Sequence, residues 1–566
     1  MKRRLLPILM TLVLVCALPI WAAFVTSGDV TNPLVCTAWA DTAEGERNSG
    51  TTQETFTEVT DETTLKKAVA DGKSVRMTQD ITLTSSLCIE KAVTLDMDGH
   101  VLTRMHTYEY DMVVIRSDAT LTLIDSNTGN LQHRFNAGET GWTKAADNAT
   151  GDGIVTVTGG VIYGDAGRSI INPCGIKILK GKLEMYGGSI VGIRNVYNAN
   201  GGGVYVSDQC TFNMYGGSIK GCYVFSDGGG VYVAAGGTFT MSGSSAITNC
   251  KGSRGGAVYN AGTFTMRDNS HIADCIYNSS IASGGGVHNK GTFTVEGGSI
   301  TGSVNDYNRE QSSDDICNEN KLDVSEGITI SCNVNVGYGG TISKGTFTGR
   351  VWIFWEGTIL GGTFTNEVIN YEGTIKAGEF TGEVTNTSGG TISGGTFDKN
   401  VANESGATIS GGTFNENVTN KTNATLNGGI FYGGVTNDGG KIEDGAYETV
   451  KFNSDNGAQA KEEKVLRGQK VAKPTDDPTK SGYTFIGWED ADGAYDFSKS
   501  VTAPLTLTAK WEKNPSSGGY YYYPTTDTKA DDTKGSPKTA DPGVALYAAL
   551  SILSLTGMVA LNGKKR

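Results

Sequence analysis

The sequence is poor in proline, histidine and charged residues, and each shortage excludes a class of protein. Its 566 residues include only 11 Pro, and its 79 Gly follow no Gly-X-Y period, which excludes a collagen triple helix. The 5 His are scattered, and the chain contains neither a C-x-x-C nor an H-E-x-x-H motif. We therefore expect no metal site and no cofactor. The net charge of −13 has the wrong sign for binding phosphate, so nucleic acid is not an expected partner.

Glycine and apolar residues, by contrast, are abundant enough for a folded and turn-rich protein. Glycine accounts for 79 of the 566 residues, about twice its usual share of roughly 7 %. Hydrophobic residues make up 38 % of the chain, which is enough to build a core. The length predicts several domains.

A unit of about 27 residues repeats through the first half of the chain. The segment 201–206 (GGGVYV) recurs three times at close to this spacing, and each copy is followed by a Phe-containing and an Ile-containing strand motif. The three sets are Val204, Val231, Val258 and Val287; Phe212, Phe239, Phe264 and Phe293; and Ile219, Ile247, Ile272 and Ile300. Short strands separated by Gly at a fixed period are typical of a solenoid, in which each coil stacks on the next.

These features predict an all-β fold in which residues 41–338 form a parallel β-helix with coils of about 27 residues. Alternation would place Val204 and Val231 inside, one above the other, about 4.8 Å apart. The coil pattern resembles the repeats of pectate-lyase-like and polymorphic outer-membrane β-helices, and this resemblance implies a right-handed coil. Upstream, Asp61 and Gly72 bracket a segment that predicts a short helix capping the first coil.

From Gly339 onward the period shortens to about 17 residues. Three apolar positions keep the same register through residues 339–447. They are Ile342, Ile359, Ile375, Ile392, Ile409, Leu426 and Ile442; Phe347, Phe364, Phe380, Phe397, Phe414, Phe431 and Tyr447; and Val351, Val368, Val384, Val401, Val418 and Val435. We expect a thinner β-solenoid here, with these ladders inside and Asn, Thr and Glu outside.

Residues 448–513 break this period and form a separate domain. The segments 482–488 (GYTFIGW), 495–497 (YDF) and 507–511 (LTAKW) resemble the Listeria-Bacteroides repeat, the B-repeat of internalins. The resemblance implies a small β-grasp-like domain of the kind found in bacterial surface proteins.

The N-terminal end predicts export. Lys2, Arg3 and Arg4 precede an almost uninterrupted apolar run from Leu5 to Ala23. Residues 1–40 are therefore predicted to be a signal peptide, cleaved after Ala40 or, alternatively, after Ala23. An uncleaved membrane anchor is the other interpretation, because the apolar run is nearly long enough to span a bilayer.

The C-terminal end predicts attachment to the cell envelope. Residues 514–535 have the composition of a flexible linker. Residues 544–561 form a long uncharged apolar run, and three basic residues close the chain, which predicts a transmembrane helix with a cytoplasmic basic end. A tail anchor alone would have the same two features.

A short motif before this apolar run favours attachment to the wall. Ser536, Pro537, Lys538, Thr539 and Ala540 precede the apolar run and the basic tail, and this order resembles the cell-wall sorting signal of Gram-positive surface proteins. In that family a sortase thiolate attacks the Thr carbonyl, and an amine of the peptidoglycan precursor resolves the acyl-enzyme. The resemblance implies cleavage between Thr539 and Ala540 within a sorting region at residues 536–566. It makes sortase and peptidoglycan the partners, with membrane insertion through residues 544–561 before sorting.

One aromatic cluster is a candidate ligand site. Trp352, Phe354 and Trp355 replace polar residues found at the same positions of neighbouring coils, and they could stack on a sugar ring. Packing beneath the long loop before Gly339 is the alternative.

No catalytic constellation is evident, so we expect no enzyme. The regions that could hold one are the insertion 125–152 and the acidic loop 306–323, because β-helix lyases and glycosidases need carboxylates converging on a groove. The alternative is that the charged side chains of both regions are simply solvent-exposed residues of loops.

The cysteines follow the coil period. Cys222, Cys250 and Cys275 each lie close to one coil period from the next, which predicts an internal ladder. Export permits disulfides between such neighbours, and unpaired stacking of small side chains is the alternative.

Together these features predict an exported protein of the Gram-positive cell wall that acts as an adhesin or a structural surface component. Host glycans or matrix proteins are its expected ligands. A carbohydrate-active enzyme on the same scaffold and a passive stalk without a ligand are the alternatives.

Overall fold

The computed structural model describes residues 55–105, 110–127, 131–138, 142–164, 174–195, 200–279, 283–305 and 315–515. The signal peptide, linker, sorting motif and apolar C-terminal segment predicted at 1–40, 514–535, 536–540 and 544–561 lie outside these residues, apart from Asn514 and Pro515. Within them, no helix is both long enough and apolar enough to cross a membrane.

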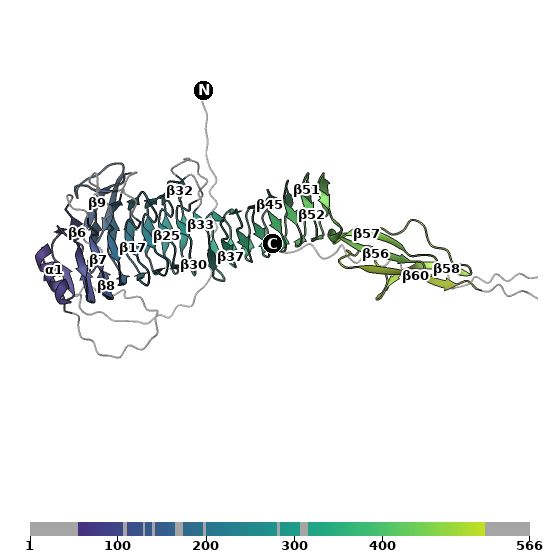
Figure 1. Ribbon diagram of the computed structural model, residues 1–566, viewed down its shortest axis with the longest axis horizontal. Coiled ribbons are helices and arrows are strands. Elements are labelled where there is room, and N and C mark those ends of the chain that lie inside the picture. The colour runs from purple at the N-terminus through teal and green to yellow at the C-terminus, as the bar shows by residue number, and fades with distance from the viewer. Residues whose placement is uncertain are drawn as a thin grey trace, which may run out of the picture. The chain divides into compact units, whose positions relative to one another are not determined.

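The chain folds into stacked coils whose strands form long parallel sheets, as the repeat predicts (Figure 1). One sheet has 17 strands and a second has 15, while the third side is an 8-stranded sheet in the longer coils and a 7-stranded sheet in the shorter ones. One long coil consists of β17 (Val204–Val206), β18 (Thr211–Met214), β19 (Ser218–Lys220) and β20 (Tyr223–Val224). One short coil consists of β48 (Val401–Asn403), β49 (Thr408–Ile409) and β50 (Thr413–Phe414).

Register confirms the predicted interior ladders. Val204 of β17 pairs with Val231 of β21 (Val231–Val233), which pairs with Val258 of β25 (Val258–Asn260), and all three are fully buried. The Phe ladder of the short coils stacks nearly parallel, with ring centroids 4.7–5.2 Å apart from Phe347 to Phe431. Strands pair coil to coil, so a coil cannot shift by one residue without moving its ladder out of the core.

The predicted helix caps the N-terminal end. α1 (Glu62–Asp71) begins after Asp61, whose carboxylate accepts a hydrogen bond from the Thr64 backbone N–H, and ends at Gly72 with φ of 76°. Its Leu65 and Val69 side chains are buried in the solenoid core, beside β1 (Thr57–Val59), which pairs only with β2 (Val75–Met77) among the described strands. The helix thereby covers the apolar end of the stack.

The change to shorter coils occurs upstream of Gly339. Val287 of β29 (Val287–Asn289) pairs with Ile316 of β33 (Ile316–Asn318), which is a full long coil further along the chain. Ile316 in turn pairs with Val334 of β36 (Val334–Val336), a step that already has the length of a short coil. This coil carries Ile330 where later coils carry Phe, which conceals the shorter repeat in the sequence.

Asparagine occupies the interior, which corrects the expectation that Asn lies outside. Asn370, Asn386, Asn403 and Asn420 are fully buried. Each side-chain amide N–H donates to the next carbonyl oxygen along the stack at 2.7–2.9 Å and to a backbone carbonyl of the next coil. Because each amide after Asn370, whose Oδ1 atom has no partner, both donates and accepts along the ladder, the cost of burying these amides is offset.

Residues 447–513 form a separate five-stranded mixed sheet. Its strands are β56 (Tyr447–Asn453), β57 (Lys461–Leu466), β58 (Tyr483–Asp490), β59 (Gly493–Ala494) and β60 (Leu505–Lys513). β56 runs parallel to β60, and the other pairings are antiparallel. Phe452, Trp488 and Leu507 form its core, with Phe452 and Trp488 meeting edge to face at 5.1 Å.

Substitution of Asn403 by Ala should destabilise the short coils. The change leaves Asn386 without an acceptor and Asn420 without a donor inside the core, so we expect a loss of about 1–3 kcal/mol of unfolding free energy. Urea denaturation followed by circular dichroism measures this loss. Asn415→Ala is the matched control, because Asn415 is exposed and bonds only to the exposed Asp398; its effect should stay within about 0.5 kcal/mol. Equal effects of the two substitutions would contradict the ladder.

Candidate functional site

The predicted aromatic cluster lies at the surface of the short coils. Trp352, in β39 (Val351–Ile353), points outward between Asn335 and Ile369 of the neighbouring coils and is half-buried. Trp355 lies in the turn that follows and is 43 % exposed. Phe354 lies between them, with its ring centroid 5.9 Å from that of Trp355.

Two tyrosines that the sequence analysis did not select complete the cluster. Tyr338 and Trp355 have ring centroids 4.8 Å apart, and Phe354 and Tyr371 are 6.1 Å apart. Tyr338, Trp355 and Tyr371 all lie three residues before the threonine that opens the next strand. Tyr338 and Trp355 lie in the turn itself, and Tyr371 ends β42 (Val368–Tyr371) at the edge of the next turn. This common position is the sequence signal that would have identified them.

The turn residues surround a shallow surface hollow of about 480 Å³. The residues that line it are Tyr338, Trp355, Glu356 and Glu372, and all four are exposed to solvent. Trp355 packs on Tyr338, next to Gly339, and remains partly open to solvent. Residues 306–314 of the preceding loop lie outside the described part, so packing of the cluster beneath that loop stays a prediction. Aromatic faces beside carboxylate acceptors suit a ligand with apolar ring faces and hydroxyl groups.

Backbone geometry shows that these residues are poorly suited to the turn they occupy. Tyr338, Trp355, Glu356 and Glu372 have φ of 50°, 35°, 68° and 63°, in the left-handed region that disfavours side chains. The equivalent turns of two later coils carry Gly389 (φ 95°) and Gly406 (φ 83°) in the Glu position. Ser388 (φ 53°) and Asn423 (φ 65°) show that later coils use the same conformation with small polar residues, so bulky side chains are the feature particular to the turns at 338 and 355.

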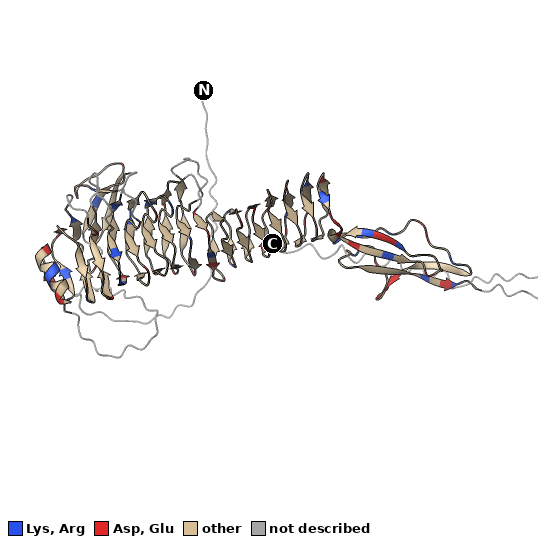
Figure 2. Ribbon diagram, viewed as in Figure 1, with Lys and Arg blue, Asp and Glu red and all other residues tan. Residues whose placement is uncertain are grey.

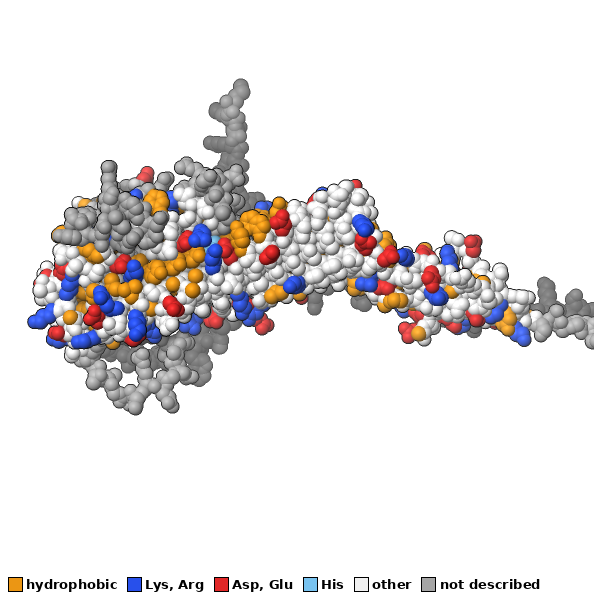
Figure 3. Space-filling view, viewed as in Figure 1, with side chains coloured by type: hydrophobic (Ala, Val, Ile, Leu, Met, Phe, Trp, Pro, Cys, Tyr) orange, Lys and Arg blue, Asp and Glu red, His pale blue; other side chains and the backbone are white. Residues whose placement is uncertain are grey.

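A second aromatic row runs along the longer coils. Tyr205, Tyr232, Tyr259 and His288 stack at 5.1, 5.1 and 5.2 Å on the outer side of β17, β21, β25 and β29. Figure 3 shows hydrophobic side chains in a band over these coils and again on the narrower ones. Charged residues are sparse along the same strands in the ribbon coloured by residue type (Figure 2). Burial raises the pKa of Tyr259 to about 12, so its hydroxyl stays protonated at neutral pH.

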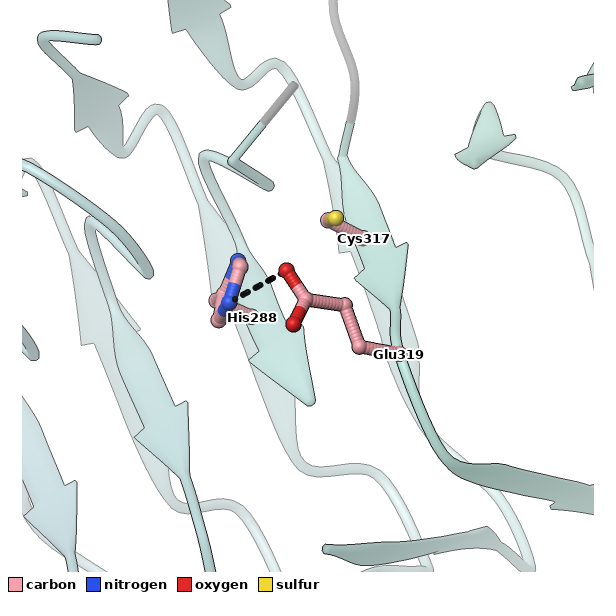
Figure 4. A group of neighbouring side chains, drawn as sticks. All are labelled: His288, Cys317 and Glu319. Atoms are coloured by element: carbon pink, nitrogen blue, oxygen red, sulfur yellow. Dashed lines mark ion pairs between the residues drawn. The ribbon is translucent and has the colours of Figure 1, made fainter. Parts of the chain in front are cut away.

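The row ends in a cluster of three potential metal ligands (Figure 4). His288, Cys317 and Glu319 place one ligand atom each within 4.8 Å of one another. The Nε2 atom of His288 lies 3.2 Å from a carboxylate oxygen of Glu319, and Lys290 Nζ lies 2.9 Å from the other oxygen. Burial opposes ionisation of Glu319, but the interactions with His288 and Lys290 outweigh it and lower the pKa of this carboxyl. The sequence shows no short motif here, because the residues meet only through coil register.

Four residues in the two regions considered for an enzyme, Asp125, His133, Trp142 and Asp315, make contacts within the scaffold. The buried carboxylate of Asp125 accepts hydrogen bonds from the backbone N–H groups of Gly99 and Gly160, both at 2.8 Å. His133 bonds to the backbone carbonyl of Gly99, and Trp142 packs in a small apolar cluster. Asp315 accepts from the backbone of Ser303 and Asn333, and burial raises its pKa.

The cysteine ladder is internal, as predicted. Cys222, Cys250 and Cys275 are fully buried and carry free thiols. Burial raises the pKa of Cys222 and Cys250 well above the usual thiol value, which makes them poor nucleophiles.

Comparison with known proteins supports the assignment of the C-terminal sheet. Residues 449–510 match the family model for the Listeria-Bacteroides repeat domain, which includes most of β56 and β60 and all of β57–β59. The chain thus carries one copy of a domain typical of bacterial surface proteins. No curated protein and no solved structure matches the chain.

Replacing Glu372 by Gly should stabilise the solenoid, by about 0.5–1 kcal/mol, because Gly adopts its φ of 63° without strain. Glu383→Gly is the matched control. Glu383 is exposed and lacks a positive φ, so the same substitution should destabilise by about 0.5–1 kcal/mol through added chain entropy. Urea midpoints of the two variants test the difference. A loss of stability in both would show that the turn does not store strain.

Proposed function

We infer that this protein is an exported, wall-anchored surface protein whose β-solenoid binds glycans through the turn formed by Tyr338, Trp355 and Tyr371. The observation that carries this proposal is an exposed aromatic cluster in which Tyr338 and Trp355 stack on each other at turn positions with positive φ. A purely structural turn would favour Gly or Asn at these positions. Selection for a binding surface explains why three successive coils retain aromatic residues.

The chemistry of the hollow favours a carbohydrate over an apolar peptide. Trp355 and Tyr338 offer ring faces for the C–H face of a sugar, while Glu356 and Glu372 offer acceptors for its hydroxyl groups. The hollow is open and shallow, which suits contact with one or two units of a polymer. Weak sites of this kind gain strength when many copies are displayed on one surface.

Surface display is supported by the Listeria-Bacteroides repeat and by the predicted signals at the two ends of the chain. The solenoid lies between the signal peptide and that repeat, so wall attachment through Thr539 would leave it outside the membrane. Adhesion to host or neighbouring-cell glycans is the role that combines these features.

Glycan binding should depend on Trp355. Residues 41–513, applied to an array of glycans and matrix proteins, should bind a defined glycan class, and Trp355→Ala should weaken that binding at least tenfold by removing a stacking face. Tyr432→Ala is the matched control, since Tyr432 is an exposed aromatic at 47 % outside the cluster; it should bind like the wild type.

The same array distinguishes the alternatives. Release of reducing ends from the bound glycans would replace the adhesin by a carbohydrate-active enzyme. Absence of both binding and release would leave a passive stalk, and binding unchanged in Trp355→Ala would remove the proposed site.

Anchoring has a separate test in cells. Thr539→Ala removes the threonine side chain beside the carbonyl that the sortase is proposed to attack, so recognition should fail and the protein should move from the wall fraction to the membrane fraction or the medium. Lys538→Arg, which keeps the charge, serves as the control and should remain wall-linked. Wall linkage unchanged in Thr539→Ala would contradict the proposed sorting signal.

A further inference from the structure

We propose that His288, Cys317 and Glu319 form a Zn²⁺ site that links two neighbouring coils of the solenoid. An imidazole, a thiolate and a carboxylate are the ligand types that Zn²⁺ takes in proteins, and three protein ligands leave a fourth position for water. The site is independent of the aromatic turn, so either proposal can fail without the other.

The geometry is close to that of a coordinated ion. The 3.2 Å between His288 Nε2 and the Glu319 oxygen compares with about 3.3 Å between two such ligands on one tetrahedral Zn²⁺. All three ligand atoms lie within 4.8 Å of one another, and a bound ion requires about 3.5 Å between sulfur and its neighbours, so the sulfur needs to move by no more than about 1.3 Å. A change in the Cys317 side-chain torsion supplies a movement of this size.

Buried polar atoms at the site lack hydrogen-bond partners in the described part of the chain. His288 is 1 % exposed, and its Nδ1 and Nε2 atoms make no hydrogen bond of acceptable geometry, although Nε2 forms the ion-pair contact with Glu319. Asn335, one coil beyond Cys317, is 4 % exposed and its Oδ1 atom is also unpartnered. Buried imidazole and amide atoms normally have hydrogen-bond partners. The unpartnered atoms of His288 and Asn335 are therefore available to a bound ligand.

The surroundings would orient the ligands. Lys290 holds the second oxygen of Glu319 at 2.9 Å, which leaves the first oxygen directed at His288. The Tyr259 ring stacks on His288 at 5.2 Å and limits rotation of the imidazole. Contacts of this type fix the position of metal ligands in known sites.

The location gives the ion a structural role. His288 pairs with Cys317 across β29 and β33, and β33 is the strand after which the long coils give way to short ones. The third sheet is interrupted here, because the 8-stranded sheet ends at β31 (Ser299–Thr301) and the 7-stranded sheet begins at β35 (Thr329–Ile330). A metal link on the continuous 15-stranded sheet would hold two coils together beside this interruption.

Zinc content of the full-length chain tests the proposal. After dialysis against trace ZnCl2, elemental analysis should find one Zn²⁺ per chain, and zinc should raise the urea midpoint relative to EDTA. In Co²⁺-substituted protein, the thiolate-to-metal charge-transfer absorption should be present and should disappear in Cys317→Ser.

The variants separate binding from folding. Cys317→Ser and His288→Ala should each lower zinc content at least tenfold, whereas His271→Ala, at a half-buried histidine outside the cluster, should keep it. Circular dichroism in EDTA checks that each variant has the wild-type fold. If His288→Ala does not fold, the zinc content of the nearly isosteric Cys317→Ser variant tests the site on its own. Zinc absent from folded wild-type protein, or retained together with the charge-transfer band in Cys317→Ser, would overturn the site.

Discussion

In-register stacking of one coil on the next is the constraint on which the rest of this structure depends. Each coil is too small to bury a core alone, so its apolar face is completed only by the coils on either side. A side chain therefore has to suit the side chain about 4.8 Å above and below it. The result is ladders of Val, Ile, Phe and Asn, in which one misplaced residue disturbs three coils.

The same constraint creates the candidate sites. A turn residue that recurs at the coil period becomes a row on the surface, so Tyr338, Trp355 and Tyr371 build one aromatic patch without any insertion. Where the coil length changes, outward residues are buried instead, and His288 and Cys317 meet there as neighbours on adjacent strands. Both candidate sites thus lie where residues depart from the repeat. The regular coils around them form the scaffold.

Much of the fold follows from the sequence because a coil period combined with β alternation fixes which residues face inward. Val204, Phe212 and Ile219 could be placed in the core in this way, as could the cap formed by Asp61 and Gly72. The inward Asn ladder could not, since polarity alone assigns Asn to the surface, and only the continuous amide pairing makes its burial favourable. The earlier onset of short coils was concealed by Ile330, which stands in place of the repeat's Phe.

The sites were less predictable. Trp355 stands out against the polar Ser388 and Ser405 of later coils, whereas Tyr338 precedes Gly339, where the 17-residue repeat becomes regular in the sequence. His288 is separated from Cys317 and Glu319 by a whole coil in sequence, so no short motif marks the three residues together. Hydrogen–deuterium exchange of the protein with its array-identified glycan tests the central claim most directly. The account predicts slower exchange confined to the turns at 336–340, 354–358 and 370–374; protection at residues 449–510 instead, or none, would contradict it.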